Sequence, residues 1–398
     1  MKILVLNCGS SSLKYQLINM DTDEVMASGK YERIGEDEAF ITHKVAGRKV
    51  EIKKAAYNHK EAIQFTLEQF TNPEYKVIDS LNEINAIGHR MVHGGEKITE
   101  SVIITDETIK IVEECVDLAP LHNPACILGI EACKEVMPEK PMVGVFDTAF
   151  HSTIEKDKYI YPIPYEYYKK YGIRKYGFHG TSHMYVSKRL AEIENKSLDG
   201  TKIITCHLGQ GSSICAIKDG KSVDTSMGLT PVGGLPMVTR SGDLDPSVVT
   251  FIMKKENIKP QEMEDILNKK SGLSSISNMA PDFRVIEEES NNGVESAKIA
   301  IEQFNYSIAS YIAKYAVAMN GVDYIIFTGG IGENQINIRK GICEKLEFMG
   351  VKLNIDNNNM RGEEKVISTD DSKIKVYVIP TNEELMIAKE TKRLIENK

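Results

Sequence analysis

The first residues able to do chemistry occur in the stretch LNCGSSSLKYQL at residues 6–17. An apolar run at residues 3–6 leads into Asn7, and strand-like residues resume after the serines. A plain two-residue hairpin turn needs only Asn-Gly or a similar pair. We therefore expect a longer turn here, in which Gly9, the hydroxyl groups and Lys14 can all offer hydrogen-bond donors to an anion.

A second stretch of the same kind lies 200 positions further along the chain. ILVLNCGSSSLKYQL (3–17) and IITCHLGQGSSICAI (203–217) align without a gap, and positions 3/203, 9/209 and 12/212 are identical. Both read as strand, Gly/Ser turn and strand. The repeat predicts a duplicated unit, with two phosphate-type hairpins facing each other across a cleft. Coincidence between two glycine-rich hairpins is the alternative.

A third glycine-rich stretch, YIIFTGGIGEN at residues 324–334, follows a predicted strand. It is not a dinucleotide-binding fingerprint, because the required glycine spacing fails at Gln335. The chain also lacks the G-x-x-x-x-G-K-[ST] pattern of P-loop enzymes. Glycines after a strand still allow the backbone to approach a base or phosphate closely, although a tight strand-to-helix turn explains them equally well.

Length and composition set the frame for these stretches. At 398 residues the chain exceeds the usual size of one hydrophobic core, so we expect two domains. The formal net charge of −8 argues against a nucleic-acid partner, although a few arginines can still build a local anion site. Seven cysteines without a C-x-x-C pair favour free thiols in a reducing cytosol. Because no apolar run reaches membrane-spanning length and the apolar start is too short for a signal peptide, we expect a cytoplasmic protein without a membrane partner.

Hydrophobic patterning predicts strands and helices in alternation along the whole chain, which indicates an α/β fold. The predicted strands lie at residues 85–92, 142–146, 202–206, 213–217, 324–328 and 375–379. The predicted helices lie at residues 61–70, 108–119 and 296–320, with a last helix from about residue 383. The aromatic and proline-rich stretch at 159–176 suits a domain boundary or an interface.

Longer motifs connect these stretches to a known family. Two hairpins followed by a GG-x-G loop resemble the loops with which the superfamily of sugar kinases, heat-shock chaperones and actin holds ATP. Within it, VLNCGSSSLKYQL (5–17) and GVFDTAFHSTI (144–154) closely resemble the two signature stretches of the acetate kinase family. The similarity runs through essentially the full chain, in the motifs HRMVHGG (89–95), PLHNPA (120–125), YGFHGTSH (176–183), DTSMGLTP (224–231), TRSGDLDP (239–246), PDFR (281–284), GGIGEN (329–334) and PTNEEL (380–385).

The resemblance implies a duplicated two-domain actin-like ATPase fold with the active site in a cleft between the domains. We expect residues 1–150, completed by a C-terminal helix at about 383–398, to form an N-terminal acyl and phosphate domain. Residues 151–382 would form a C-terminal nucleotide-binding domain. The implied reaction is reversible, in-line and Mg²⁺-dependent transfer of a phosphoryl group from ATP to acetate, with Mn²⁺ able to replace Mg²⁺. The family also implies a homodimer.

A reaction of this kind brings two anions together, so it needs cations and exact positioning of the reactants. Arg90 and Arg240 are candidates for binding the carboxylate and the transferring phosphoryl group, because guanidinium groups pair bidentately with both. By resemblance, Arg240 and His179 also stabilise the transition state. The resemblance gives Asp147, at the end of a predicted strand, a catalytic role as proton donor. Because a carboxylate substrate is already ionised, Asp147 could instead orient Arg90 or a magnesium-bound water.

The resemblance also carries over the remaining site residues, by their positions in the matched motifs. The acyl-binding residues are expected to be Arg90, Val92, Leu121, His122, Phe178 and Pro231, with an ordinary packed histidine as an equal alternative for His122. The expected ATP-binding residues are Ser10, Ser12, Lys14, His207, Leu208, Gly209, Gln210, Gly211, Asp282, Phe283, Arg284, Gly330, Ile331, Gly332, Glu333 and Asn334. Asn7 and Glu383 are expected to bind Mg²⁺, whose preference for hard oxygen ligands and few protein contacts suits them.

The sequence TNEE at residues 381–384 predicts a capping box for the last helix. In this interpretation Thr381 is the cap and Glu384 reaches back to it. Glu383 then remains free to point toward the substrate.

Two stretches depart from the family pattern. Gln210 stands where the family usually has Asn, and the loop PVGGLPMVT at 231–239 differs from the commoner PLEGLMMGT. These differences leave open a propionate kinase or an acetate kinase with a non-standard phosphoryl donor. A third alternative is a non-catalytic nucleotide-binding protein of the same superfamily, which would not need Arg90, Arg240 and His179 to converge beside an apolar pocket.

Overall fold

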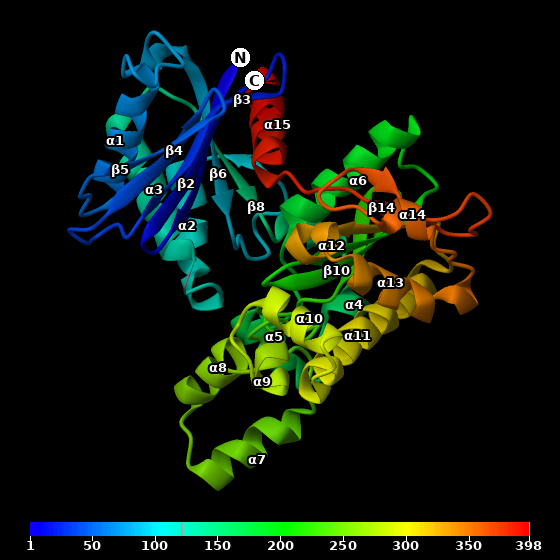
Figure 1. The fold of residues 1–398 in the computed structure, drawn as a ribbon. Helices are drawn as coiled ribbons and strands as arrows, with labels where there is room; N and C mark the ends of the chain where they lie inside the picture. The colour runs from blue at the N-terminus through cyan, green and yellow to red at the C-terminus, as the bar shows by residue number, and fades with distance from the viewer. Residues whose placement is uncertain (121, 398) are drawn as a thin grey trace. The chain divides into compact units, whose positions relative to one another are not determined.

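The computed structural model describes residues 1–120 and 122–397, and the chain divides into two compact units (Figure 1). Unit 1 consists of Met1–Ser152 together with Asn382–Lys398, and unit 2 consists of Thr153–Thr381. Each unit is built around its own β-sheet.

The sheet of unit 1 has the strand order β5-β4-β3-β2-β1-β6-β8-β7. Its strands are β1 (Lys2–Gly9), β2 (Ser12–Asn19), β3 (Glu24–Glu32), β4 (Phe40–Val45), β5 (Arg48–Lys53), β6 (Ile84–Met91), β7 (Val102–Ile103) and β8 (Met142–Phe146). Strands β1, β6 and β8 run parallel to one another, whereas the other neighbours are antiparallel. The carboxyl ends of these three strands therefore meet at one edge of the sheet, which is the usual place for a ligand in such sheets.

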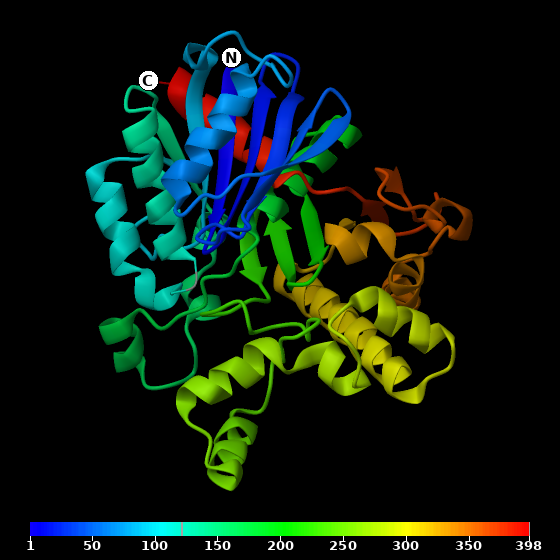
Figure 2. The same cartoon turned by 60° about the vertical axis from the view of Figure 1, so that its left-hand side comes forward.

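Helices cover both faces of this sheet. Its helices are α1 (His59–Thr71), α2 (Asp106–Glu114), α3 (Asn123–Val136) and α15 (Glu383–Glu396), with 3₁₀ turns at Leu81–Glu83 and Val116–Leu118. Helix α3 packs on the face that carries Cys8, because a side chain at Gly129 of α3 would clash with that thiol. Helix α15 packs on β1, β6 and β8 from the opposite face, where Ile387 joins Val5 in an apolar cluster. Figures 1 and 2 both show this last helix, in red, against the strands of unit 1.

The sheet of unit 2 has the strand order β11-β10-β9-β12-β14-β13. Its strands are β9 (Lys202–Leu208), β10 (Ser212–Lys218), β11 (Lys221–Thr225), β12 (Tyr324–Thr328), β13 (Lys365–Val366) and β14 (Lys375–Val378). Its helices are α4 (Lys156–Tyr159), α5 (Tyr165–Tyr171), α6 (Gly180–Glu194), α7 (Pro246–Glu256), α8 (Pro260–Lys269), α9 (Gly272–Ser277), α10 (Phe283–Asn291), α11 (Glu295–Met319), α12 (Gly329–Asn334), α13 (Ile336–Lys345) and α14 (Ile355–Asn358). A 3₁₀ turn occurs at Glu347–Met349, and another, Ala149–Thr153, spans the boundary between the two units.

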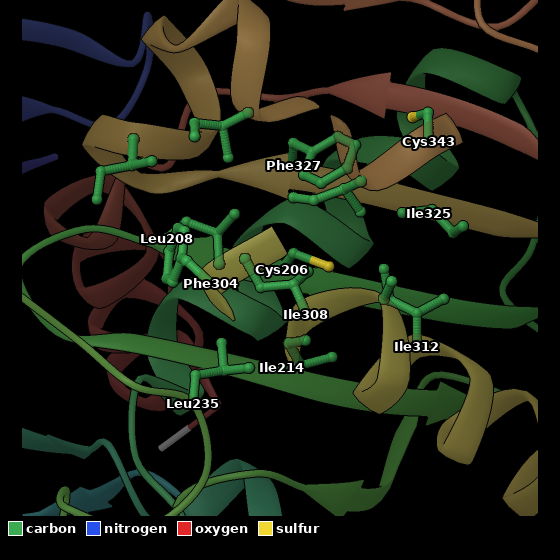
Figure 3. Close-up of a cluster of buried hydrophobic side chains, with 14 of the residues drawn as sticks. Cys206, Leu208, Ile214, Leu235, Phe304, Ile308, Ile312, Ile325, Phe327 and Cys343 are labelled. Carbon is green, nitrogen blue, oxygen red and sulfur yellow. The ribbon is translucent and has the colours of Figure 1, made fainter. Parts of the chain in front are cut away.

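The long helix α11 covers one face of this sheet and supplies much of the core of unit 2. Figure 3 shows Phe304, Ile308 and Ile312 of α11 beside Cys206 of β9 and Phe327 of β12. All of these side chains are fully buried. Because side chains along a strand alternate between faces, the residues next to Cys206 in β9 and next to Phe327 in β12 point to the opposite face of the sheet.

The two sheets repeat one arrangement. The order β3-β2-β1-β6-β8 in unit 1 corresponds to β11-β10-β9-β12-β14 in unit 2, with the same parallel and antiparallel neighbours. The duplicated unit that the sequence repeat predicts is therefore confirmed.

Most predicted elements lie within two residues of their observed ends, but two expectations are wrong. The first hairpin does not have a long turn, because Gly9 pairs directly with Ser12 and leaves a two-residue turn. The helix predicted at 108–119 ends at Glu114, and a separate 3₁₀ turn follows. None of the helices among the described residues is both long and apolar enough to cross a membrane.

Candidate functional site

Asn7 and Arg90 lie on the α15 face of unit 1, at the carboxyl ends of β1 and β6. Side chains along a strand alternate between faces. Val5 packs with Ile387 of α15, so Asn7, two residues later, is on the same face. A side chain at Gly88 would clash with Ile387, so Arg90 also points to this face.

Asp147 completes this group directly after β8. Val143 and Val145 of β8 belong to the apolar cluster under α15, so the same alternation directs Asp147 to the α15 face. Nη2 of Arg90 donates a hydrogen bond of 2.5 Å to Oδ2 of Asp147. The Asp147 carboxylate raises the pKa of Arg90 above its usual range, against the opposing effect of burial. The side chain of Arg90 remains 22% exposed, whereas that of Asp147 is 2% exposed, so the guanidinium is the member of the pair that can meet a substrate.

Glu383 is the first residue of α15 and interacts electrostatically with the same group. Its burial raises the pKa of its carboxyl group to about 7; Asp147 reinforces this shift, and Arg90 and Lys14 oppose it. Lys14 lies opposite Asn7 in the ladder between β1 and β2. Glu383 and Asn7 therefore belong to one charged region of unit 1, together with Arg90, Asp147 and Lys14.

The capping box predicted for α15 is wrong. Asn382, not Thr381, is the cap, and its side chain accepts a hydrogen bond of 3.0 Å from the backbone N–H of Leu385. The hydroxyl of Thr381 instead lies 2.8 Å from that of Ser182. Asn is as effective a cap as Thr, and the short Asn side chain one residue later takes the role.

Asn7 and Glu383 could hold a metal ion as two hard oxygen ligands. Mg²⁺ commonly takes one or two protein oxygens and completes its shell with water and substrate phosphates. In residues 1–120 and 122–397 there is no group of three or more His, Cys, Asp or Glu side chains arranged to hold a metal on their own. The oxygen donors of Asn7 and Glu383 thus fit Mg²⁺ better than a soft or fully protein-ligated ion.

Two of the predicted acyl-binding residues are buried apolar groups. Val92 follows β6 and is 4% exposed, and Phe178 in unit 2 is 3% exposed. His122 precedes α3 as its cap residue without donating or accepting a side-chain capping bond. Pro231 lies in the loop before Arg240, and Leu121 lies outside the described residues. The role of these residues stays a prediction.

In unit 2, His179 occupies a constrained position at the start of α6. Its φ of 57° is left-handed, a conformation that costs a non-glycine residue free energy and is maintained only by its surroundings. Its Nδ1 lies 2.8 Å from Oγ of Ser213, and its ring stacks on His207 at 4.2 Å. Nε2 of His183 also lies 2.8 Å from the Ser213 hydroxyl. A buried hydroxyl between two imidazoles therefore fixes the orientation of the His179 ring.

Arg240 lies beside His179 and the second hairpin. A Cβ atom at Gly211 would be 3.1 Å from Nη1 of Arg240 and 3.4 Å from Cε1 of His179. Nη1 contacts the carbonyl of Pro231 at 3.4 Å and the sulfur of Met237 at 3.7 Å. Burial lowers the pKa of Arg240. Because these contacts carry no negative charge, the guanidinium is well suited to receive an anion.

A cavity of about 490 Å³ opens in unit 2 next to the second hairpin. It is lined by Gly209, Gln210, Val238, Pro281, Asp282, Phe283, Arg284, Gly330, Ile331, Asn334, Gln335 and Arg361. Its size and its mixture of apolar and polar groups are typical of a small-molecule site. Eight of the residues predicted to bind ATP are among these, including the atypical Gln210.

Other predicted ATP-binding residues lie elsewhere. His207, Leu208, Gly211, Gly332 and Glu333 are in unit 2 but not in the cavity lining. Ser10, Ser12 and Lys14 are in the first hairpin of unit 1.

Glu333 has an evident structural task. Its Oε1 accepts hydrogen bonds from the backbone N–H groups of Gly329 at 2.8 Å and Thr381 at 3.1 Å. The carboxylate therefore ties the start of α12 to the end of unit 2.

Sequence reasoning missed several residues of these sites. His183 lies in the first turn of α6 and His179 caps that helix, and only the structure shows that both rings contact Ser213. Arg361 and Gln335 belong to no motif of the chain, and their place in the cavity lining depends on contacts between distant segments.

Comparisons with known proteins find relatives that match the whole chain. Residues 2–389 match the acetokinase family. An acetate kinase of Thermoanaerobacterium thermosaccharolyticum is 56% identical over 398 residues, which cover 100% of both chains. An acetate kinase of Thermoanaerobacter pseudethanolicus is 57% identical over 398 residues, covering 100% of this chain and 99% of that one.

Solved structures show the same similarity. A crystal structure of Porphyromonas gingivalis acetate kinase has a TM-score of 0.96 and 48% sequence identity, with 99% of each chain covered. A propionate kinase from Francisella tularensis has a TM-score of 0.91 and 42% identity, again with 99% of each chain covered.

Proposed function

This chain belongs to the acetokinase family, and from that membership we propose that it transfers the γ-phosphoryl group of ATP to acetate, forming acetyl phosphate and ADP. The observation that carries the proposal is the juxtaposition of Arg240, His179 and Gly211 beside the cavity of unit 2. A non-catalytic nucleotide-binding protein would not need a partly buried arginine, in contact with a carbonyl and a thioether, beside His179.

In the proposed reaction a carboxylate oxygen of acetate attacks the γ-phosphorus of ATP in line. The new bond joins this oxygen to phosphorus, and the bond between phosphorus and the β–γ bridging oxygen breaks, so that ADP leaves with that electron pair. No proton is needed, because acetate is ionised at neutral pH and ADP leaves as an anion. The barrier lies in the repulsion between anions and in the charge on the equatorial oxygens.

Cationic residues from both units meet these demands. We assign Arg90 to the acetate carboxylate, because its guanidinium is partly exposed and oriented by Asp147. Arg240 and His179 would stabilise the transferring phosphoryl group. Unit 1 thus acts as the acyl and phosphate domain, and unit 2 as the nucleotide-binding domain. The cavity in unit 2 and the position of Arg90 and Val92 in unit 1 support this division, whereas the predicted acyl residues Phe178 and Pro231 belong to unit 2.

We propose that Asn7 and Glu383 hold Mg²⁺, with Mn²⁺ as a substitute. When bound, the ion would neutralise part of the negative charge on the phosphates during transfer. The chain itself places the buried carboxyl group of Glu383 at the start of α15. Asp147 raises the pKa of this group, and Arg90 and Lys14 lower it. Glu383 would hold the ion as a carboxylate, because metal ligands of this type must be deprotonated.

Propionate is the second candidate acceptor. It is favoured by the similarity to the Francisella tularensis propionate kinase and by the atypical loop at 231–239. We expect acetate to be preferred, with propionate still a substrate, since one methylene group in an apolar pocket is worth only about 1–3 kcal/mol. Val92→Ala should narrow the difference by enlarging the proposed pocket.

The test is a hydroxylamine trap for acyl phosphate with ATP, Mg²⁺ and either acetate, propionate or butyrate. We expect hydroxamate to form with kcat/KM in the order acetate, propionate, butyrate. A butyrate value equal to or above that of acetate would refute the substrate assignment. Failure to form any acyl phosphate while ATP still binds would favour the non-catalytic alternative.

We also propose a homodimer, which the surface of α7 supports. This helix buries none of its residues, and its apolar side chains Val248 and Phe251 are 41% and 61% exposed. An isolated helix of this length is marginal in water, so a partner would stabilise it. Sedimentation should give twice the monomer mass, and Phe251→Glu should shift the mass toward the monomer.

The seven buried cysteines without disulfides support a cytoplasmic location.

A further inference from the structure

Arg339 lies wholly inside unit 2, one turn into α13, and is fully buried. Nη1 donates hydrogen bonds to the carbonyls of Gly332 at 3.0 Å and Glu333 at 2.9 Å, which end α12. Nη2 donates to the carbonyls of Asn358 at 2.8 Å and Met360 at 2.9 Å. Arg339 therefore joins two segments that are distant in sequence.

All five N–H groups of this guanidinium are used, because Nε donates to Oδ1 of Asn358 at 2.7 Å. Asn358 is itself buried and fixed by a hydrogen bond of 3.0 Å from its Nδ2 to the carbonyl of Ile336. Every acceptor is an uncharged oxygen. Burial accordingly lowers the pKa of Arg339 to about 10, and the guanidinium remains charged at neutral pH.

The two segments joined by Arg339 form neighbouring parts of the cavity wall. Helix α12 contributes Gly330, Ile331 and Asn334, and Arg361 follows Met360 directly. A further hydrogen bond of 3.1 Å runs from the N–H of Gly362 to the carbonyl of Glu333. Arg361 is itself exposed and is held in the lining by the backbone on either side of it.

We propose that Arg339 is a positioning residue of the nucleotide site: its hydrogen bonds fix the turn that carries Arg361 against α12, and this wall binds the nucleotide. Arg339 touches no substrate in this assignment. Arg361 supplies a cation to the wall, and the anionic phosphates or the ribose hydroxyls of a nucleotide are the groups that a guanidinium can bind. The inference rests on the proposed function only in taking a nucleotide as the ligand of the cavity.

Lysine cannot replace Arg339 in this geometry. Its ammonium group has three donors at a single point, whereas the acceptors around Arg339 lie on two backbone segments and one amide. Arg339→Lys preserves the charge and most of the volume, so it tests the hydrogen bonds that join the two segments and not the charge.

The experiment measures ATP and ADP binding to the full chain by isothermal titration calorimetry, with steady-state kinetics alongside. We expect Arg339→Lys to raise the Kd for both nucleotides at least tenfold, while the KM for acetate changes less than twofold. Arg361→Ala, at an exposed position, should also raise the Kd. Arg189→Lys is the matched control, because Arg189 pairs with Glu192 and Glu364 at the surface and does not line the cavity.

A double-mutant comparison distinguishes positioning from a general loss of stability. If Arg339 acts through the Arg361 wall, Arg339→Lys should weaken binding by a smaller factor in the Arg361→Ala background than in the wild type. Equal factors in both backgrounds, or an unchanged Kd in folded Arg339→Lys, would overturn the proposal.

If Arg339→Lys does not fold, Asn358→Ala removes the acceptor of Nε and gives the same comparison. An unchanged Kd in that variant would equally overturn the proposal. Wild-type protein that binds ATP but forms no acyl phosphate would refute the proposed function while leaving this inference to be decided by the Kd values.

Discussion

Asp147 holds Arg90 by a hydrogen bond of 2.5 Å between two strands whose carboxyl ends meet at one edge of the sheet of unit 1. The carboxylate is buried and the guanidinium is partly exposed. A carboxylate in this position can orient Arg90 without exchanging a proton. The pair supports the orienting role for Asp147, which stays a prediction beside the proton-donor role.

We expect Asp147→Asn to lower kcat by at least about 100-fold at every pH, since the amide keeps the shape of the side chain but loses the charge that orients Arg90. A proton-donor role would instead remove one limb of the pH–rate profile. The measurement is kcat and kcat/KM from pH 5.5 to 9. A loss confined to one limb would contradict the orienting role.

Arg240→Ala should lower kcat by roughly 10³-fold, the magnitude typical of an arginine that stabilises a transferring phosphoryl group. Its contacts in the free protein are with a carbonyl and a sulfur atom, so little other structure depends on it. ATP binding, followed by calorimetry, should stay within about threefold of the wild-type value. Arg189→Ala serves as the surface control, and near-normal turnover by Arg240→Ala would show that the assignment is wrong.

Gly330→Gln should block the cavity without unfolding unit 2. A Cβ atom at Gly330 would have no neighbouring atom within 4 Å, and the residue lines the cavity. We expect the KM for ATP to rise at least tenfold (~1.4 kcal/mol), with less effect on a short polyphosphate donor, which carries no nucleoside. Lys340→Gln, on the neighbouring helix α13, is the control for the new side chain. Equal losses with both donors would contradict a nucleoside contact at Gly330.

His89 should make unit 1 sensitive to acid. It is buried on β6, its Nε2 has no hydrogen-bond partner among the described residues, and burial lowers its pKa to about 4. Because the unfolded chain would bind this proton near pH 6.5, the unfolded state holds more protons between pH 4 and 6.5. The free energy of unfolding should therefore be largest above pH 6.5 and fall as the pH drops to 4, by about 3 kcal/mol from this group.

Urea unfolding of wild type and His89→Leu at several pH values between 4 and 7 measures this effect. The loss of stability with acid should be smaller in the variant, whatever its stability at pH 7. His43, whose pKa is also lowered by burial, remains in both proteins and contributes equally. Identical slopes would refute the assignment to His89.

Short buried strands were the most predictable part of the fold. The runs at 142–146 and 324–328 have the predicted bounds, because each consists of consecutive buried residues and ends at a polar group. The turn of the first hairpin was not predictable, since its length depends on the register in which Gly9 meets Ser12. The cap of α15 is Asn382 and not Thr381. This was not predictable, because the hydroxyl of Thr381 contacts Ser182, a residue far away in sequence.

The candidate site shows the same division. Motifs located Arg240, His179 and eight residues of the cavity lining, because their chemistry is local to short stretches. Arg339 and Arg361 were missed, since their roles depend on the contact between α12 and the segment after α14. No periodicity or spacing in the sequence records that contact.

The return of the chain to unit 1 has a consequence for biosynthesis. Helix α15 covers the apolar face formed by β1 and β8, yet the ribosome makes it only after all of unit 2. Until then Val5 and Val145 are not covered by α15, and the nascent chain exposes an apolar surface that chaperones can recognise. Glu383 arrives with the same helix. Newly made protein therefore cannot assemble its proposed metal ligands until α15 has been synthesised.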